Sequence, residues 1–126
     1  MNILLDSAFV IDQLNGRPEA RTRWQRMFEA ADNPLINDVV VCEVGSGLLP
    51  HERIALEALL EPLEFVQPGP EVALQAGAWR AETRARGRTL SLADALIAAA
   101  AFFNGAVVLT RNVRDFSLTP VQVETY

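Results

Sequence analysis

Four acidic residues lie where an apolar segment gives way to a predicted turn or helix. They are Asp6, Glu43, Asp94 and Asp115, called the acidic quartet below. Asp6, for example, directly follows the apolar run Ile3–Leu5. Acids within apolar sequence are costly to bury unless something compensates their charge. Carboxylate oxygens gathered at one place are the ligands that Mg²⁺ and Mn²⁺ prefer, so these positions are candidates for a divalent metal centre.

Each of these acids also has a purely structural interpretation. Asp6 and Asp115 are both placed to cap a short helix. Ser91 and Asp94 nearly match a capping box, with Asp in place of the usual Glu. Glu43 is explained equally well as an exposed acid on a helix.

The positions of the acids along the chain favour the metal interpretation. In open α/β sheets, ligands bind beyond the carboxyl ends of the strands. Asp6 and the turn that holds Asp115 follow apolar strands, and Asp94 lies early in a helix, where its side chain leans back towards the same edge. Converging carboxylates repel one another and titrate as a coupled group unless cations enter. A metal ion resolves that conflict.

The alternation of predicted elements favours an α/β fold with a mainly parallel central sheet of four to five strands flanked by helices. We predict strands over residues 2–5, 35–36, 63–66 and 107–109, with a short edge strand over 121–123. We predict helices over residues 7–14, from 18 to an end at Asn33-Pro34, over 52–60, 70–86 and 94–103. The run Val39–Val41 favours a strand by β propensity, whereas Asp38 is a good helix N-cap.

Composition indicates one globular domain over residues 1–126. Half of the residues are hydrophobic, and no apolar run reaches the roughly 18 residues that a membrane span needs. The N-terminus has no basic segment typical of a secretory signal, and the single cysteine excludes an internal disulfide. We therefore expect a cytoplasmic protein that does not bind a membrane.

The charged residues exclude several classes of phosphoryl chemistry. The net charge is −5, and all eleven basic residues are arginines. Without a lysine, the chain has neither a P-loop nor the phosphate-binding residue of a receiver domain. A haloacid-type phosphatase needs a second Asp two residues after the first, where this chain has Ala8.

The segments around the acidic quartet resemble the motifs of PIN-domain ribonucleases, most closely the VapC toxins of toxin–antitoxin pairs. These segments are Met1–Ser7, Val41–Gly47, Ser91–Ala99 and Leu109–Phe116. The last two are the specific ones, and the resemblance covers nearly the whole chain. It places Glu43 on a helix, which decides the ambiguous segment in favour of a helix beginning at Asp38. One departure is Asn37-Asp38, where the family often has small hydroxyl residues.

The resemblance implies a metal-dependent endoribonuclease in which the acidic quartet holds Mg²⁺ or Mn²⁺. Asp6 and Asp94 are the best candidates for direct ligands. The other two acids are expected to act through bound water or to orient the attacking water. Three further residues are candidate donors that aim the carboxylates, with ordinary turn and cap roles as the alternative: Ser7, Thr110 and Asn112.

The resemblance also implies partners. These are an RNA substrate, a VapB-type antitoxin and a second copy of the chain in a homodimer. Arg111 and Arg114 flank the fourth acid and are candidates for RNA phosphate contacts, with a salt bridge as the alternative. Two other functions stay open: a PIN ribonuclease outside any toxin pair, and a non-catalytic RNA-binding or assembly module.

Three further residues are expected to have no catalytic role. Asp12 lies two helical turns from Asp6, and we expect it at the surface. Cys42 is interpreted as a small buried hydrophobe. His51 is the only histidine, and we expect it to face solvent or cap a helix.

Overall fold

The computed structural model describes residues 1–67 and 69–126. The elements are β1 (Asn2–Leu5), α1 (Ser7–Leu14), α2 (Pro18–Glu29), β2 (Asn33–Ile36), α3 (Asp38–Ser46), the 3₁₀ turn η1 (Pro50–Glu52), α4 (Arg53–Leu60), β3 (Glu64–Phe65), α5 (Pro70–Ala85), α6 (Leu92–Phe103), β4 (Ala106–Leu109), α7 (Val113–Phe116) and β5 (Val123–Glu124). Among these described residues, no helix has both the length and the apolar character needed to cross a bilayer.

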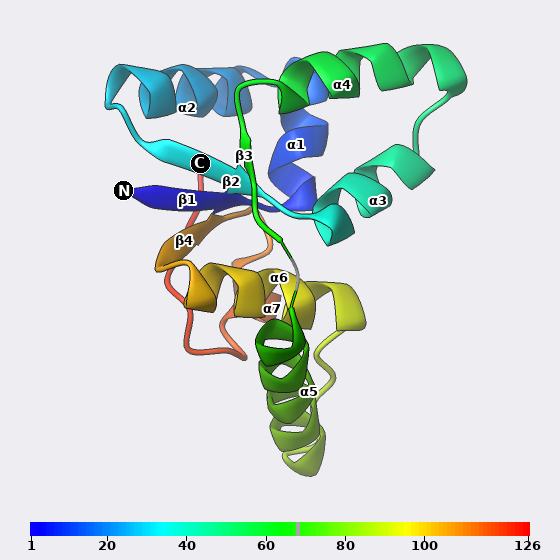
Figure 1. The fold of residues 1–126 in the computed structure, drawn as a ribbon, viewed down its shortest axis with the longest axis vertical. Helices are drawn as coiled ribbons and strands as arrows, with labels where there is room; N and C mark the ends of the chain where they lie inside the picture. The colour runs from blue at the N-terminus through cyan, green and yellow to red at the C-terminus, as the bar shows by residue number, and fades with distance from the viewer. Residues whose placement is uncertain (68) are drawn as a thin grey trace.

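The strands form one parallel sheet with the order β3-β2-β1-β4-β5. The predicted α/β class and parallel sheet are therefore confirmed. In Figure 1 the sheet crosses the molecule between two groups of helices, with α1 and α2 on one side and α5 and α6 on the other. Because both faces are covered, the inner strands are continuously apolar, as in Ile3–Leu5 of β1 and Ala106–Leu109 of β4.

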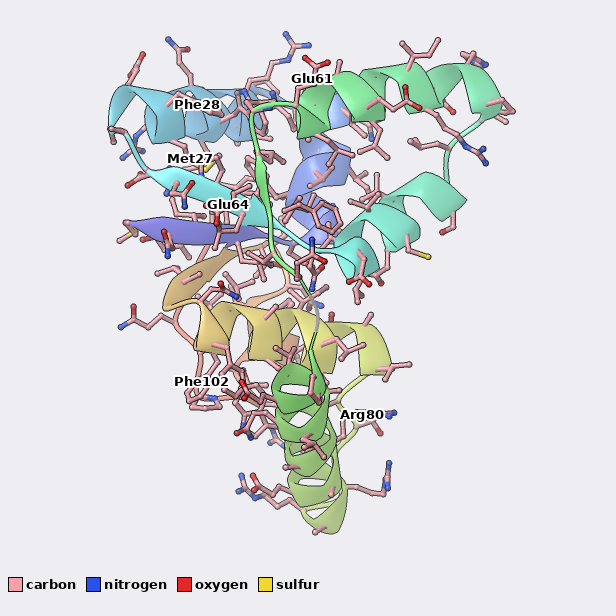
Figure 2. The ribbon with its side chains drawn as sticks, viewed as in Figure 1. Met27, Phe28, Glu61, Glu64, Arg80 and Phe102 are labelled. Carbon is pink, nitrogen blue, oxygen red and sulfur yellow. The ribbon has the colours of Figure 1, made fainter. Side chains whose placement is uncertain are left out.

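Helix α6 packs directly on β1 and β4. Its inward positions are mostly alanine, and Ala95, Ala98 and Ala99 have no exposed surface. These small side chains let the helix approach the sheet closely, which places its first turn at the carboxyl ends of the strands. On the other face Met27 of α2 is fully buried, and Figure 2 shows it between that helix and the sheet.

Two contacts hold α6 against α5. The Trp79 and Phe102 rings meet edge to face with centroids 5.6 Å apart, and Figure 2 shows Phe102 on the part of α6 beside α5. The Arg80 Nε donates a hydrogen bond to the Leu90 carbonyl oxygen at 3.0 Å, which ties α5 to the segment that leads into α6. Helix α6 is thus held near both of its ends, by Phe102 in its last turn and by Leu90 just before its first residue.

Helix α3 forms where β propensity alone favours a strand. Val40 and Val44 lie on its buried face, so packing overrides the local preference of β-branched residues. The helix prediction is confirmed, but the cap is one residue earlier than predicted. Asn37 has extended backbone angles, and its Oδ1 accepts a hydrogen bond from the Val40 N–H at 3.1 Å. Asp38 already lies in the first turn.

Most other boundaries agree with the predictions to within two residues, and two of the differences are informative. Helix α2 ends at Glu29, and Asn33-Pro34 begins β2 instead of ending the helix. The edge strand β5 is confirmed as the outermost strand, but it lies at Val123–Glu124. Its position is set by pairing with β4, which local alternation of residue types does not encode.

The capping of α3 supplies a stability test. Asn37→Ala removes a buried acceptor from a helix N-terminus and should lower the free energy of unfolding by about 1 kcal/mol. Asp38→Ala is the matched control: its carboxylate is exposed and accepts only from its neighbour's N–H, so it should cost less. Urea unfolding of both variants measures the difference, and a larger loss in Asp38→Ala would contradict the assignment.

Candidate functional site

The carboxyl edge of the sheet receives all four members of the acidic quartet from different elements. Asp6 directly follows β1, and Asp115 lies on α7 just after β4. Glu43 is on α3, which follows β2, and Asp94 is in the first turn of α6. Figure 1 shows that α1 and α6 begin at the same end of the sheet. Residues more than a hundred positions apart in sequence therefore meet here.

Asp6 is the most enclosed of these acids, with 3% of its surface exposed. Its Oδ2 accepts a hydrogen bond of 2.6 Å from the Thr110 hydroxyl, and its Oδ1 lies 3.5 Å from the Ser7 hydroxyl. Burial raises the pKa of the Asp6 carboxyl above its ordinary value, and the Thr110 hydrogen bond opposes that rise. The Asp6 carboxylate is therefore shielded from water and held in one orientation by its hydrogen bond from Thr110.

A chain of hydrogen bonds joins Asp6 to Asp115. The Thr110 hydroxyl that donates to Asp6 also accepts the Asn112 backbone N–H at 2.8 Å. The Asn112 side-chain amide in turn donates to Asp115 Oδ2 at 2.7 Å. The loop after β4 thus orients two acids with two side chains, Thr110 and Asn112. Both were predicted to aim carboxylates, and these are the contacts that such a role requires.

Asp94 shows that the four charges share one region. Burial raises the pKa of its carboxyl to about 6, and the negative charges of Asp6, Asp115 and Glu43 contribute to the rise. Ser91 opposes the rise, and its hydroxyl accepts the Asp94 N–H at 3.1 Å, which is the predicted N-cap contact. Helix capping and electrostatic coupling therefore coexist at this position.

Glu43 lies at the solvent side of the group. Desolvation raises the pKa of its carboxyl, the Ser7 hydroxyl lowers it, and the charge of Asp6 raises it further. Ser7 therefore interacts with two acids of the quartet. This is the arrangement expected of a residue that orients carboxylates.

The site contains the carboxylate oxygens that a hard cation prefers as ligands. These oxygens are not arranged as a closed cage. Within residues 1–67 and 69–126, no three acidic, histidine or cysteine side chains are grouped tightly enough to hold one ion by themselves. The acids are coupled through space instead. Mg²⁺ usually keeps several waters and binds through one or two carboxylates, so an open carboxylate set of this kind fits it.

A cleft of about 320 Å³ opens beside Asp115. Its lining includes Arg88, from the segment before α6, and Arg114, from α7. Both arginines are exposed. The sequence does not place Arg88 beside the fourth acid; only the fold brings the two residues together. A larger cleft, about 750 Å³, is lined by residues of α2 and the segment 124–126 and contains no member of the quartet.

The two arginines predicted to contact RNA, Arg111 and Arg114, have different environments in the structure. The Arg111 Nε lies 2.6 Å from Asp12 Oδ2, so the salt-bridge alternative describes Arg111. The prediction for Asp12 is wrong: only 3% of its surface is exposed. Its partners Arg111 and Tyr126 are distant in sequence, so helical spacing alone could not reveal that they cover this part of α1.

The expectations for two other residues have different outcomes. Cys42 was predicted to be buried, but it is exposed, because the buried side of α3 is formed by Val40 and Val44. His51 lies in the η1 turn and is exposed, as predicted. Neither residue contributes to the carboxylate group.

The raised pKa of Asp94 predicts how the metal-free protein responds to pH. The folded state holds this proton up to about pH 6, whereas the unfolded chain releases it near pH 3.8. Stability should therefore fall as the pH rises through that window and level off above it. Asp94→Asn removes the charge, so in chelator it should be more stable than wild type at pH 7.5 and less dependent on pH.

Thermal melts at pH 5 and pH 7.5 in EDTA measure this effect. Asp38→Asn, an exposed acid on α3, is the control and should keep the wild-type pH profile. An Asp94→Asn melting temperature below that of wild type at pH 7.5 would contradict the proposed repulsion.

Comparisons with known proteins agree with the fold. The profile of the PIN domain family matches residues 3–121. Ribonuclease VapC19 of Mycobacterium tuberculosis is 28% identical over 117 residues, which cover 93% of this chain and 94% of that protein. VapBC2 from Rickettsia felis, solved bound to promoter DNA, superposes with a TM-score of 0.88 at 20% identity over 100% of this chain and 99% of that one.

A toxin–antitoxin complex from Klebsiella pneumoniae gives a TM-score of 0.79 at 27% identity and covers 98% of this chain and 96% of that one. The family profile spans nearly the whole sequence, and the strand order places four acids at one edge of the sheet. This chain belongs to the PIN domain family.

Proposed function

We propose that this protein is a metal-dependent endoribonuclease and the toxin of a toxin–antitoxin pair. The observation that carries the proposal is the coupling of Asp94 to the other three acids of the quartet at the carboxyl edge of the sheet. Relatives named as VapC ribonucleases support the activity. The family profile over residues 3–121 and a single continuous core support reading residues 1–126 as one PIN domain.

The reaction is hydrolysis of an RNA phosphodiester bond, with water attacking in line at phosphorus. Asp6 and Asp94 are the proposed direct ligands of Mg²⁺ or Mn²⁺, since burial raises the pKa of both carboxyls. Glu43 and Asp115 are proposed to act through water or to orient the attacking water. When bound, the cation supplies positive charge that offsets the charge developing on the phosphoryl oxygens and acidifies water.

The residues that donate to these carboxylates are proposed to set their orientation. Thr110 holds Asp6 and Asn112 holds Asp115, each through a hydrogen bond shorter than 2.8 Å. Ser7 serves both Asp6 and Glu43. Hydroxyl and amide donors also offset part of the negative charge while the site is empty of cations.

The cleft beside Asp115 is the proposed entry for the RNA backbone. Arg114 and Arg88 present two guanidinium groups there, and planar guanidinium groups suit phosphate oxygens. Arg114 is therefore the proposed RNA contact. Arg111 keeps this role only in part, because its Nε is held by Asp12.

The proposed partners are a VapB-type antitoxin and a second copy of the chain. Support comes from the solved VapBC assemblies of similar fold and from exposed apolar side chains outside the acidic site. These include Leu49, Ile54 and Leu74, each more than half exposed. With RNA as substrate and an antitoxin as regulator, the protein would act in the cytoplasm.

Asp94→Asn tests the catalytic assignment. Wild type should cleave a mixed RNA pool in Mn²⁺ or Mg²⁺ and not in EDTA. The variant should lose more than about 100-fold in rate, the upper end of what disturbing a metal ligand's support costs. Glu57→Gln, an exposed acid on α4, should retain wild-type cleavage. Equal rates in wild type and Asp94→Asn, or no cleavage with either metal, would favour the non-catalytic binding module.

Arg114→Gln tests the proposed RNA cleft. Loss of one phosphate contact should weaken binding across RNA sequences and reduce the slope of log affinity against log salt by about 0.7. Binding is measured by fluorescence anisotropy in the Asp94→Asn background, so that no RNA is cleaved. Arg84→Gln, an exposed arginine near the end of α5, is the control and should leave the slope unchanged. Equal slopes in all three proteins would exclude Arg114 as a contact.

A further inference from the structure

Asp12 is a buried carboxylate that serves no role in the proposed reaction. It lies on α1 and has 3% of its surface exposed. Its Oδ2 lies 2.6 Å from the Arg111 Nε and accepts a hydrogen bond of 2.6 Å from the Tyr126 hydroxyl. The Arg17 Nε lies 3.6 Å from its Oδ1. A buried charge survives only with such compensation, so two distant residues and the nearby Arg17 are committed to this one side chain.

Arg111 occupies the centre of the loop that aims two acids of the quartet. The residue before it, Thr110, donates to Asp6, and the residue after it, Asn112, donates to Asp115. An ion pair at Arg111 therefore restrains the backbone from which both orienting side chains project. The buried Asp12 is the fixed point of that restraint, because α1 packs on α2 and α3.

The segment that ends the sheet secures the same loop a second time. The Thr110 N–H donates to the Glu124 carbonyl oxygen at 3.0 Å, which extends the pairing of β4 and β5. Two residues further on, the Tyr126 ring meets Phe9 edge to face at 4.9 Å. That packing directs the Tyr126 hydroxyl towards Asp12. Backbone pairing thus holds Thr110, and the phenol hydroxyl holds the Asp12 carboxylate that pairs with Arg111.

We infer that Asp12, Arg111 and Tyr126 are positioning residues that fix the 110–112 loop and thereby the orientation of Asp6 and Asp115. The inference rests on the proposed metal-dependent function, because orientation matters only if the two acids act together. A variant that lacks the network still contains all four acids of the quartet, but its 110–112 loop is free to move. The expected consequence is weaker cation binding and a lower kcat, with little change in KM for Tyr126→Phe, which removes no proposed RNA contact.

A purely structural role for this network predicts a different result. In that case each variant would lower stability in proportion to the contacts removed, and folded protein would bind cations normally. The ion pair between Arg23 and Glu124, with its Nη2 and Oε2 atoms 3.0 Å apart, offers the matched control. This pair ties β5 to α2 through the Glu124 side chain, whereas Thr110 bonds to the Glu124 backbone carbonyl, which the Arg23 change leaves in place. Within the described residues, Arg23 forms no ion pair or hydrogen bond with Asp12 or Arg111.

The experiment compares Arg111→Gln, Arg111→Lys, Tyr126→Phe and Arg23→Gln with wild type. Mn²⁺ affinity is measured by calorimetry at a temperature where every variant is folded, and kcat and KM are measured separately. We expect Arg111→Gln to bind Mn²⁺ about tenfold more weakly or worse, as is typical when the support of a metal ligand is lost. Tyr126→Phe should shift affinity in the same direction by less, and Arg111→Lys should restore part of the loss.

Arg23→Gln should lower the melting temperature while leaving Mn²⁺ affinity unchanged. Wild-type Mn²⁺ affinity in folded Arg111→Gln and Tyr126→Phe would overturn the inference and leave the proposed nuclease intact. Wild-type protein that binds Mn²⁺ but cleaves no RNA would refute the nuclease, while the affinities would still decide the role of the network. Wild-type protein that binds no Mn²⁺ would overturn both.

Discussion

Mutual repulsion among the four acids of the quartet is the constraint on which the rest of the site depends. The pKa of Asp94 rises to about 6 because burial and three neighbouring carboxylates all disfavour its charged form. This arrangement costs stability in the absence of a cation, a cost often found where a protein is organised for function. The surrounding structure has to supply that stability elsewhere, and it does so through a parallel sheet covered on both faces.

Buried packing and hydrogen bonds lie directly behind the acids. The alanine-rich face of α6 brings the first turn of that helix, and Asp94 with it, to the ends of β1 and β4. The loop after β4 links Asp6 and Asp115 through Thr110 and Asn112. Each acid is therefore held by an element with its own independent packing. Such preorganisation is what metal-dependent chemistry requires of a protein that supplies only carboxylates.

Sequence patterns predicted most of the elements, and their failures have identifiable causes. The helix at α3 was assigned correctly against β propensity, but its cap is Asn37, because the extended backbone there points the amide at the Val40 N–H. Asp12 was expected at the surface and is buried. Its partner Tyr126 is 114 positions away, so no local pattern could reveal the contact. The position of Arg88 beside Asp115 likewise could not be predicted from a local pattern, because the two residues are distant in sequence.

The sequence by itself predicted the α/β class and the mainly parallel sheet from its alternation of elements, and its resemblance to PIN-domain motifs indicated four acids as candidates, because such patterns are local properties of the chain. Only the tertiary structure decided which charges share a desolvated region, which arginine lines the cleft beside Asp115, and which one is held by Asp12. Electrostatic energy and hydrogen bonding depend on distances between atoms. Those distances exist only once residues far apart in the chain are brought together by the sheet.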